Sequence, residues 1–516
     1  MQEKILASID IGTNSFHLVI ASVNEKGQFQ VLTRDKEVVR LGSGSNDMKY
    51  LSPEATERGV STLKRFKLIC DSYDAEIRAI GTSAIREALN KDKFITSVLE
   101  NTGIHIEVIT GLEEARLIYL GVLQALEVFD KKILLIDIGG GSTEFLVGRK
   151  GKVLFANSVK IGALRLTQKY FGDKKTKQRS IDEARLYVKN FLNPVVRNLT
   201  DFDYDFAIGT SGTITNLGAV IYAETNSYDD EQVNLNNYVY NKRQLWKAIK
   251  KIFNAESISD RYNIPGLDPK RADIIQAGAV ILEQIFIELN IEELTLSNYA
   301  LREGIMIDTI SKEQTGFQLG NLSDVCYNSI IRLAENNGYD KLHCESVLKH
   351  AVSIFDYLKE KFSLTEKDKE FLEAASLLHD IGHRISHSQH HRHSYYLIRN
   401  SEMLGFNDNE IEIIANIARY HRKSHPKSKH EGFDRLNLAD KDKVRKLAGI
   451  LRIADMLDRG HKQIVKSIGI KGKNYTLILI ANSLPETDAT LEIWGANLRK
   501  SLFEQSFGYS VTIEKQ

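Results

Sequence analysis

A short motif rich in glycine and hydroxyl side chains occurs twice in the sequence, each time after an apolar segment. The first copy is Asp10-Ile-Gly-Thr-Asn-Ser15 and the second is Asp137-Ile-Gly-Gly-Gly-Ser142. Extended-looking residues follow both copies, so we expect turns between two strands, whereas a P-loop opens a helix and carries a Lys-Ser/Thr pair. Converging backbone N–H groups bind anions, and glycine lets phosphate oxygens come close. Two such turns facing one another would hold a phosphate through seven residues: Gly12, Thr13, Asn14, Ser15, Gly140, Gly141 and Ser142.

Three further segments offer groups that suit phosphate chemistry. One is a turn with hydroxyls and backbone donors, formed by Ser211, Gly212 and Thr213. Arg86 follows a strand-like segment, where its guanidinium can form paired hydrogen bonds with phosphate. Glu113 and Glu114 begin a helix after the strand 104–109, and a carboxylate there can act as a general base toward water. Taken singly, each segment has an ordinary alternative: a plain turn, a surface arginine, or acids favoured by the helix dipole.

Strands and helices that alternate along the chain must position these groups. Residues 1 to about 308 alternate β-branched runs with helical patterns, which is typical of an α/β fold. From about 320 to 460 the apolar residues recur at three- and four-residue spacing, which predicts an all-helical segment. Alternating runs then return at 475–480 and 509–513 and predict a small sheet. We therefore expect four domains, with these limits: 1–122, 123–308, 309–460 and 461–516.

The composition is that of a folded protein with little net charge. The 516 residues include 69 Lys plus Arg and 68 Asp plus Glu, which gives a net charge of +1. This balance excludes an overall cationic coat for nucleic acid, so any phosphate binding must be local. The three cysteines show no metal or disulfide spacing, and no apolar run is long enough for a transmembrane segment. We expect a cytoplasmic protein with no transmembrane segment and no nucleic acid partner.

Together the motifs resemble the exopolyphosphatase and guanosine pentaphosphate phosphohydrolase (Ppx/GppA) family. The resemblance covers essentially the whole chain, in motif order and spacing, and rests on four segments: Ser8–His17, Glu113–Leu117, Asp137–Glu144 and Ser211–Thr213. It implies an α/β fold with two actin-like domains of the ribonuclease H type, followed by an all-helical HD-like domain. A small α+β domain would close the chain. It also implies a homodimer that uses Mg2+ to hydrolyse terminal phosphoanhydride bonds.

The same resemblance implies a role for individual residues. Glu114 corresponds to the family's presumed base, while Asp137 and Glu144 match acidic residues near metal and water and are therefore the candidate Mg2+ ligands. Arg86 joins them as a catalytic residue that binds phosphate, together with the three glycine-containing turns. One departure occurs late in the chain, where Asn298 stands in place of the family's aspartate, and no role is carried over to it.

Exopolyphosphatase activity is the expected function, with orthophosphate released processively from the end of inorganic polyphosphate by in-line attack of water. Hydrolysis of the 5′-phosphate of guanosine-5′-triphosphate,3′-diphosphate (pppGpp) is the nearest alternative, because both substrates present a similar end to the turns. Two other classes remain open. An actin-like kinase would need an adenine pocket and a second substrate, and a sensor of alarmone or polyphosphate would bind phosphate without turnover.

Histidines are concentrated late in the chain, with twelve of the fourteen between His343 and His461. Four residues lie on apolar helix faces and resemble the HD phosphohydrolase signature: His350, His379, Asp380 and Asp455. We expect them to bind one transition metal, since mixed histidine and carboxylate ligands suit Mn2+, Fe or Zn2+. Three histidines remain as extra ligand candidates: His391, His393 and His421. Five others match no ligand pattern and are expected in loops or at the surface: His383, His387, His390, His425 and His430.

Overall fold

The computed structural model describes most of the chain, in these ranges: 4–24, 27–44, 48–172, 176–225, 233–313, 325–401, 403, 406, 408–430, 432–473, 475–484 and 487–516. The fold divides into two compact units, unit 1 (Met1–Val325) and unit 2 (Cys326–Gln516). Among the described residues, no helix is both long and apolar enough to pass through a membrane.

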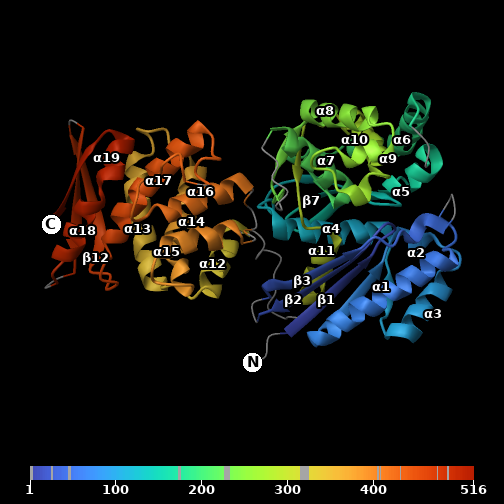
Figure 1. The fold of residues 1–516 in the computed structure, drawn as a ribbon, viewed down its shortest axis with the longest axis horizontal. Helices are drawn as coiled ribbons and strands as arrows, with labels where there is room; N and C mark the ends of the chain where they lie inside the picture. Colours follow the sequence, from blue (N-terminus) through green and yellow to red (C-terminus); the bar gives the residue numbers. More distant parts are fainter. Residues whose placement is uncertain are drawn as a thin grey trace. The chain divides into compact units, whose positions relative to one another are not determined.

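Unit 1 begins with a five-stranded mixed sheet. Its strands are β1 (Lys4–Ile11), β2 (Phe16–Val23), β3 (Phe29–Glu37), β4 (Glu76–Gly81) and β5 (Ile106–Val108). The order is β3-β2-β1-β4-β5; β1 to β3 pair antiparallel, and β1, β4 and β5 pair parallel. Apolar side chains of β1 and β2 form a buried core with helix α1 (Pro53–Ser72), which runs along the blue sheet in Figure 1.

A second mixed sheet in unit 1 repeats this order. Its strands are β6 (Ile133–Ile138), β7 (Thr143–Arg149), β8 (Lys152–Val159), β9 (Phe206–Thr210), β10 (Val239–Asn241) and β11 (Glu293–Leu296). The order β8-β7-β6-β9-β11 has the same strand directions as the first sheet, and β10 adds an antiparallel edge. Two equivalent sheets give unit 1 the duplicated, actin-like arrangement that the resemblance implied.

The repeated motif forms the same strand-turn-strand structure in both sheets, as its sequence predicts. In the first, Gly12 N–H donates to the Ser15 carbonyl at 3.2 Å, between β1 and β2. In the second, Gly139 N–H donates to the Ser142 carbonyl at 2.9 Å, between β6 and β7. The turns are therefore structural equivalents.

Helices cover both sheets of unit 1. Besides α1 they are α2 (Ser83–Glu87), α3 (Lys91–Thr102), α4 (Gly111–Ala125), α5 (Ala163–Leu166), α6 (Gln178–Leu199), α7 (Ser211–Thr225), α8 (Lys242–Asn254), α9 (Ile258–Tyr262), α10 (Ile275–Glu288) and α11 (Leu301–Glu313). Helices α4 and α11 pack very closely, because a Cβ at Gly304 would lie 1.7 Å from the Leu117 carbonyl oxygen. Only glycine allows this approach. The contact fixes α4, which carries Glu114 in its first turn.

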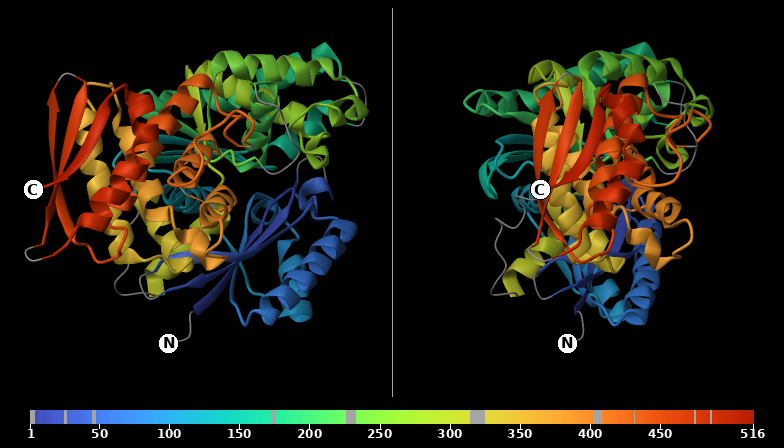
Figure 2. Two further views of the ribbon diagram at one scale, coloured as in Figure 1. Left: turned by 60° about the vertical axis from the view of Figure 1, so that its left-hand side comes forward. Right: turned by 90° about the vertical axis from the view of Figure 1, so that its left-hand side faces the viewer.

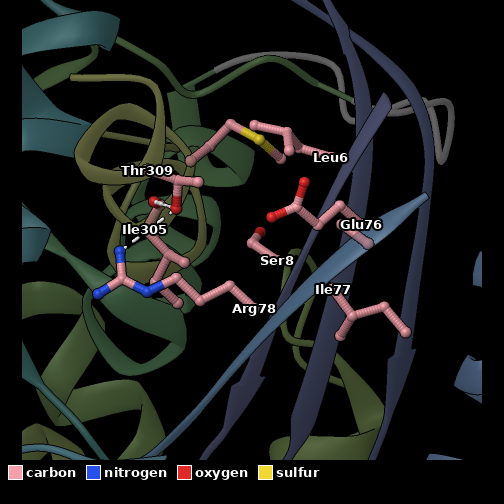
Figure 3. A pocket seen from close by; sticks show the side chains of 9 residues that line it. Leu6, Ser8, Glu76, Ile77, Arg78, Ile305 and Thr309 are labelled. Atoms are coloured by element: carbon pink, nitrogen blue, oxygen red, sulfur yellow. Dashed lines mark hydrogen bonds between the residues drawn. The ribbon is translucent and has the colours of Figure 1, made fainter. Parts of the chain in front are cut away.

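A network of ion pairs holds α11 against β4 and α4. The buried carboxylate of Asp308 accepts from Arg78 at 2.7 Å and from Arg116 at 2.6 Å. Figure 3 shows Arg78 reaching Thr309, to which it also donates, beside a small pocket lined by β1, β4 and α11. Burial alone would raise the pKa of Asp308, but hydrogen bonds from Lys312, Arg116 and Arg78 outweigh it and lower the pKa to about 2.

Replacing Asp308 with Asn should destabilise unit 1 by roughly 3 kcal/mol, because two guanidinium groups lose their shared buried partner. Urea unfolding of both proteins measures this difference. Since the folded pKa is lowered, the difference should be complete above pH about 4 and shrink as the pH falls toward 2. Glu107, the exposed second partner of Arg78, provides the control, and Glu107→Gln should cost well under 1 kcal/mol. Equal losses in the two variants would contradict the role of Asp308.

Unit 2 combines a helical bundle with a small sheet. Its helices are α12 (Val325–Asn336), α13 (Lys341–Leu358), α14 (Glu366–Leu378), α15 (His390–Arg399), α16 (Asp408–Arg419), α17 (Leu438–Met456), α18 (Thr490–Arg499) and α19 (Ser501–Phe507). The strands are β12 (Val465–Lys473), β13 (Thr476–Ser483) and β14 (Ser510–Lys515), in the order β12-β13-β14. The helical segment and the late sheet are therefore as expected. Figure 2 shows the red strands beside the helices, and both belong to one hydrophobic core.

Candidate active site

The two equivalent glycine turns of unit 1 face one another. A Cβ at Gly140 would lie 3.2 Å from Cβ atoms of Thr13 and Asn14, and a Cβ at Gly141 would lie 2.6 Å from Ser83 Oγ. A larger side chain at either glycine would collide with the opposite turn or with α2. Thr13 and Asn14 are buried here, so the turns form a closed, polar contact between the two domains of unit 1.

The third segment, Ser211 to Thr213, is not the separate turn that the sequence predicted: it begins helix α7 beside Asp137. Ser211 opens helix α7 with a positive φ of 72°, a conformation that is uncommon for a residue with a side chain and that often marks functional sites. Its hydroxyl donates to Asp137 Oδ1 at 2.9 Å. A Cβ at Gly212 would lie 1.7 Å from a guanidinium nitrogen of Arg271, so this arginine packs directly over the turn.

The two neighbouring glutamates in the first turn of α4 have different partners. Glu113 is bound by Arg116 through two hydrogen bonds of 2.8 and 2.7 Å. Glu114 is buried and accepts a hydrogen bond of 2.9 Å from Arg86. Arg86 also donates to the Ile109 carbonyl at 3.0 Å. The structure thus makes Arg86 the partner of Glu114, a contact that the sequence did not indicate.

Glu144 and Asp137 each keep one buried carboxylate oxygen without a hydrogen-bond partner among the described residues. The other oxygen of Glu144 accepts from Ser142 at 2.7 Å and from Ser158 at 2.8 Å. The Ser142 side chain therefore orients Glu144, in addition to any phosphate contact of its turn.

Carboxylates gather where the turns meet, and Asp10 joins the predicted three. Burial, with repulsion from Glu114, raises the pKa of Asp10 to about 8. Burial also raises the pKa of Asp137 to about 7, against the opposing hydrogen bond from Ser211. The pKa of Glu144 is raised by burial and by repulsion from Glu114 and Asp137. Negative charges so crowded favour a bound cation.

The donor chemistry fits Mg2+, which prefers oxygen ligands. Asp137 and Glu144 would hold it through their unpartnered buried oxygens. Among the described residues, no three of these carboxylates bring donor atoms within 4.8 Å of one another. This agrees with the usual mode of Mg2+ binding, in which one or two carboxylates, water and substrate phosphates share the ion.

A cationic group, which the sequence did not reveal, faces the acids. Burial, together with repulsion from Arg271, lowers the pKa of Lys36 to about 8, and Arg302 contributes in the same direction. Arg302 also contacts His17 at 2.9 Å. Its positive charge lowers the pKa of Asp10 and so partly offsets the effect of burial. Asp10 had a signal in the repeat, since it is equivalent to Asp137; Arg271 and Lys36 belong to no motif.

Replacing Arg86 with Ala should weaken substrate binding by roughly 1.5–3 kcal/mol, the value of one charged hydrogen-bond interaction. Burial raises the pKa of Glu114, and Arg86 lowers it, so removing Arg86 should raise that pKa further. The acid limb of the pH profile of kcat/KM should then move to higher pH, because Glu114 loses its proton only there. Arg86→Lys keeps the charge and should shift the profile less. Unchanged KM and pH profile in Arg86→Ala would place Arg86 outside the site.

Unit 2 brings together three of the four predicted metal ligands, His379, Asp380 and Asp455. The fourth prediction, His350, is wrong in its position. His343 occupies that place, with its Nε2 atom 3.5 Å from Asp455 and 4.0 Å from Asp380. His350 lies two turns further along α13, where its Nε2 is 3.4 Å from Ser346 Oγ. Among the described residues it belongs to no cluster of three or more metal-ligating atoms within 4.8 Å of one another.

The structure also shows where the other histidines lie. His421 and Asp380 lie in one cluster of metal-ligating atoms, and His390 belongs to it although the sequence indicated no ligand role for that residue. His390 is only 3 % exposed, because it begins α15 against the end of α16. His383 and His387 are exposed and adjoin His390. His391 and His393 are in none of these groups.

Comparisons with known proteins agree with this architecture. The model of the Ppx/GppA phosphatase family matches residues 19–313, and that of Ppx/GppA phosphatase domain III matches residues 325–488. A guanosine-5′-triphosphate,3′-diphosphate pyrophosphatase of Photobacterium profundum is 32 % identical over 420 residues, which are 81 % of this chain and 80 % of that protein.

Two solved structures are similar to this fold. An exopolyphosphatase from Cytophaga hutchinsonii is 29 % identical with a TM-score of 0.56, covering 61 % of this chain and 99 % of its own. The Ppx/GppA family member of Aquifex aeolicus is 27 % identical with a TM-score of 0.51, covering 60 % of this chain and 99 % of its own. The chain therefore belongs to the Ppx/GppA phosphatase family and is a hydrolase of phosphoanhydride bonds.

Proposed function

We propose that this protein is an exopolyphosphatase that releases orthophosphate processively from the end of inorganic polyphosphate. The observation that carries the proposal is the group of cations, Lys36, Arg271 and Arg302, beside the buried acids. The charges of Arg271 and Arg302 lower the pKa of Lys36 and of His17, so several cations are held close together here. A chain of phosphates would supply negative charge to them at successive positions.

The buried groups account for the chemical step. The facing turns and the Ser211 turn would hold the terminal phosphate, and Mg2+ at Asp137 and Glu144 would offset negative charge on the phosphate oxygens. Glu114 would take a proton from water, whose oxygen forms a bond to the terminal phosphorus. The bridging P–O bond then breaks, and its oxygen stays with the shortened chain. Positioning contributes most in such reactions, which suits a site built from rigid strand ends.

Hydrolysis of pppGpp is the second candidate, and the Photobacterium profundum relative named for that substrate favours it. Phosphate release from long-chain polyphosphate and from pppGpp, measured with one preparation, distinguishes the two. A higher kcat/KM for polyphosphate would support our proposal. A higher kcat/KM for pppGpp would replace it with the second candidate.

Salt should weaken the hydrolysis of long polyphosphate more than that of tripolyphosphate, because binding a longer polyanion releases more counterions. The slope of log(kcat/KM) against log[salt] measures this effect. Lys36→Gln should flatten the slope for long chains by about one, as expected for one lost phosphate contact. Lys64→Gln, an exposed position on α1, is the matched control. Equal slopes for short and long chains would argue against a row of phosphate subsites.

A further inference from the structure

Unit 2 contains two groups of metal-ligating atoms that share Asp380. In the first group, Oδ2 of Asp380 lies 3.7 Å from His379 Nε2 and 4.0 Å from His343 Nε2. Oδ1 of Asp455 completes this group, at 3.5 Å from His343 Nε2 and 3.7 Å from His379 Nε2. The donor atoms of His343, His379 and Asp380 lie within 4.8 Å of one another, and the Asp455 carboxylate adjoins both imidazoles.

The second group lies on the other oxygen of the same carboxylate. Oδ1 of Asp380 is 3.2 Å from His390 Nε2 and 3.6 Å from His421 Nε2. The two imidazole nitrogens are themselves 3.3 Å apart. Asp380 therefore presents one oxygen to each group, as a carboxylate does when it bridges two metal ions.

These separations suit coordination better than hydrogen bonding. Most exceed the 2.7–3.2 Å typical of N–H···O bonds. Ligands about 2.1 Å from a metal lie about 3.0–3.4 Å from one another in octahedral or tetrahedral geometry. The second group is close to this range at 3.2–3.6 Å, and the first group is wider at 3.5–4.0 Å, so its side chains would move slightly inward around an ion. The Nε2 atoms of His343 and His379 are fully buried and have no hydrogen-bond partner among the described residues. Buried polar atoms are rarely left in this condition unless something binds them.

Each of the four histidines is held by its outer nitrogen. Nδ1 of His379 donates to the Ser376 carbonyl at 2.8 Å, and Nδ1 of His421 donates to the Ala418 carbonyl at 2.6 Å. Because a carbonyl only accepts, the proton is on Nδ1 and the Nε2 lone pair points inward. Nδ1 of His390 lies 3.2 Å from the carbonyl of the residue three positions earlier, while Arg422 contacts its Nε2 at 3.0 Å and would have to turn away for an ion to bind there. His343 uses a carboxylate, Asp458, at 3.0 Å. Such outer contacts are typical of metal-ligating histidines.

We infer that unit 2 contains a second active centre, with two first-row transition metal ions bridged by Asp380, which hydrolyses a phosphate ester. Nitrogen and oxygen ligands together select such metals over Mg2+. Arg422, 3.0 Å from His390 Nε2, and the exposed His383, 3.6 Å from Asp380, place cationic and donor groups for a phosphate where the centre meets solvent. The inference goes beyond the proposed function, because none of these residues belongs to unit 1.

The reaction follows from two adjacent cations, which make water more acidic and offset the charge on phosphate oxygens. The water oxygen forms a new bond to phosphorus as the ester P–O bond breaks. The proton that the water loses ends on the departing alcohol, so the products are an alcohol and a phosphate with one ester bond fewer.

Metal content of the full-length protein, purified without chelator and loaded with Mn2+, tests the centre. Elemental analysis should give about two Mn2+ ions per chain in unit 2. Any ion held by unit 1 is counted separately, as the ion that the Glu114→Gln and Asp137→Asn variants lose. His421→Ala should lose one ion, and Asp380→Asn should lose both, whereas His393→Ala should retain both. No ion, or the same content in Asp380→Asn, would overturn the inference. Because a variant can misfold, the rise in melting temperature on adding Mn2+ to wild type provides a second measurement, and no rise would also count against it.

Hydrolysis is tested in a Glu114→Gln background, which removes the catalytic base proposed for unit 1. With Mn2+, this variant should hydrolyse p-nitrophenyl phosphate or bis(p-nitrophenyl) phosphate, and adding Asp380→Asn should lower the rate at least 100-fold. The two compounds distinguish a monoester from a diester substrate. Failure with both, in metal-loaded protein, would overturn the catalytic part of the inference. Loss of polyphosphatase activity without loss of this activity would show that the two centres are separate.

Discussion

Replacing Glu114 with Gln is expected to lower kcat by about 100-fold to 10,000-fold, the range typical of removing a general base. Glutamine keeps the shape of the side chain and can still accept from Arg86 through its amide oxygen. It cannot take a proton from water. Binding of polyphosphate should therefore change much less than turnover, and steady-state kinetics that separate KM from kcat will show the difference.

Glu113→Gln is the matched control for this experiment. The two glutamates are neighbours on the same helix turn, but Glu113 is bound by Arg116, away from the other acids. Its replacement should change kcat by less than about tenfold. A Glu114→Gln variant that turns over nearly as fast as wild type, or as fast as Glu113→Gln, would remove Glu114 from the chemical step.

Asp137→Asn should lower activity at ordinary Mg2+ concentrations by roughly 100-fold to 1,000-fold, since metal charge stabilisation amounts to several kcal/mol. Asparagine can still accept from Ser211, so the α7 turn should keep its conformation. The lost charge and the introduced N–H donors would oppose a cation at the buried Oδ2 position. Half-maximal activity should then require more Mg2+.

Asp130→Asn is the control here, because Asp130 is exposed in the same domain and pairs with Lys150 on the surface. Its Mg2+ dependence should match that of wild type. If the activity and Mg2+ dependence of Asp137→Asn also match wild type, Asp137 does not hold the metal.

Much of the active-site architecture of unit 1 could be predicted because it is local in sequence. The Asp-Ile-Gly motif forms its turn from consecutive residues, so the repeat at Asp10 and Asp137 already implied two equivalent strand-turn-strand units. The partners across the domains could not be predicted in this way. Arg271 follows no motif, and it reaches Gly212 only because η3 (Pro269–Arg271) packs over the start of α7.

The error at His350 has a simple physical origin. His343 and His350 are seven residues apart on α13, which is close to two helical turns, so both lie on the same buried face. Helical periodicity cannot distinguish them. The two histidines differ only in their position along the helix, about 10 Å apart. Which of them reaches the metal-ligating residues depends on how α13 packs against α14 and α17. The expectation of a loop or surface position for His390 failed similarly, because its burial depends on tertiary contacts.

Hydrolysis of polyphosphate in 18O-enriched water tests the central claim, that the acids of unit 1 direct water to the terminal phosphorus. Mass spectrometry of the products locates the new P–O bond. Our account predicts that the 18O from water appears in the released orthophosphate and not in the shortened chain, in wild type and, at a much lower rate, in Glu114→Gln. Label in the shortened chain would contradict it, because water would then have attacked the penultimate phosphorus.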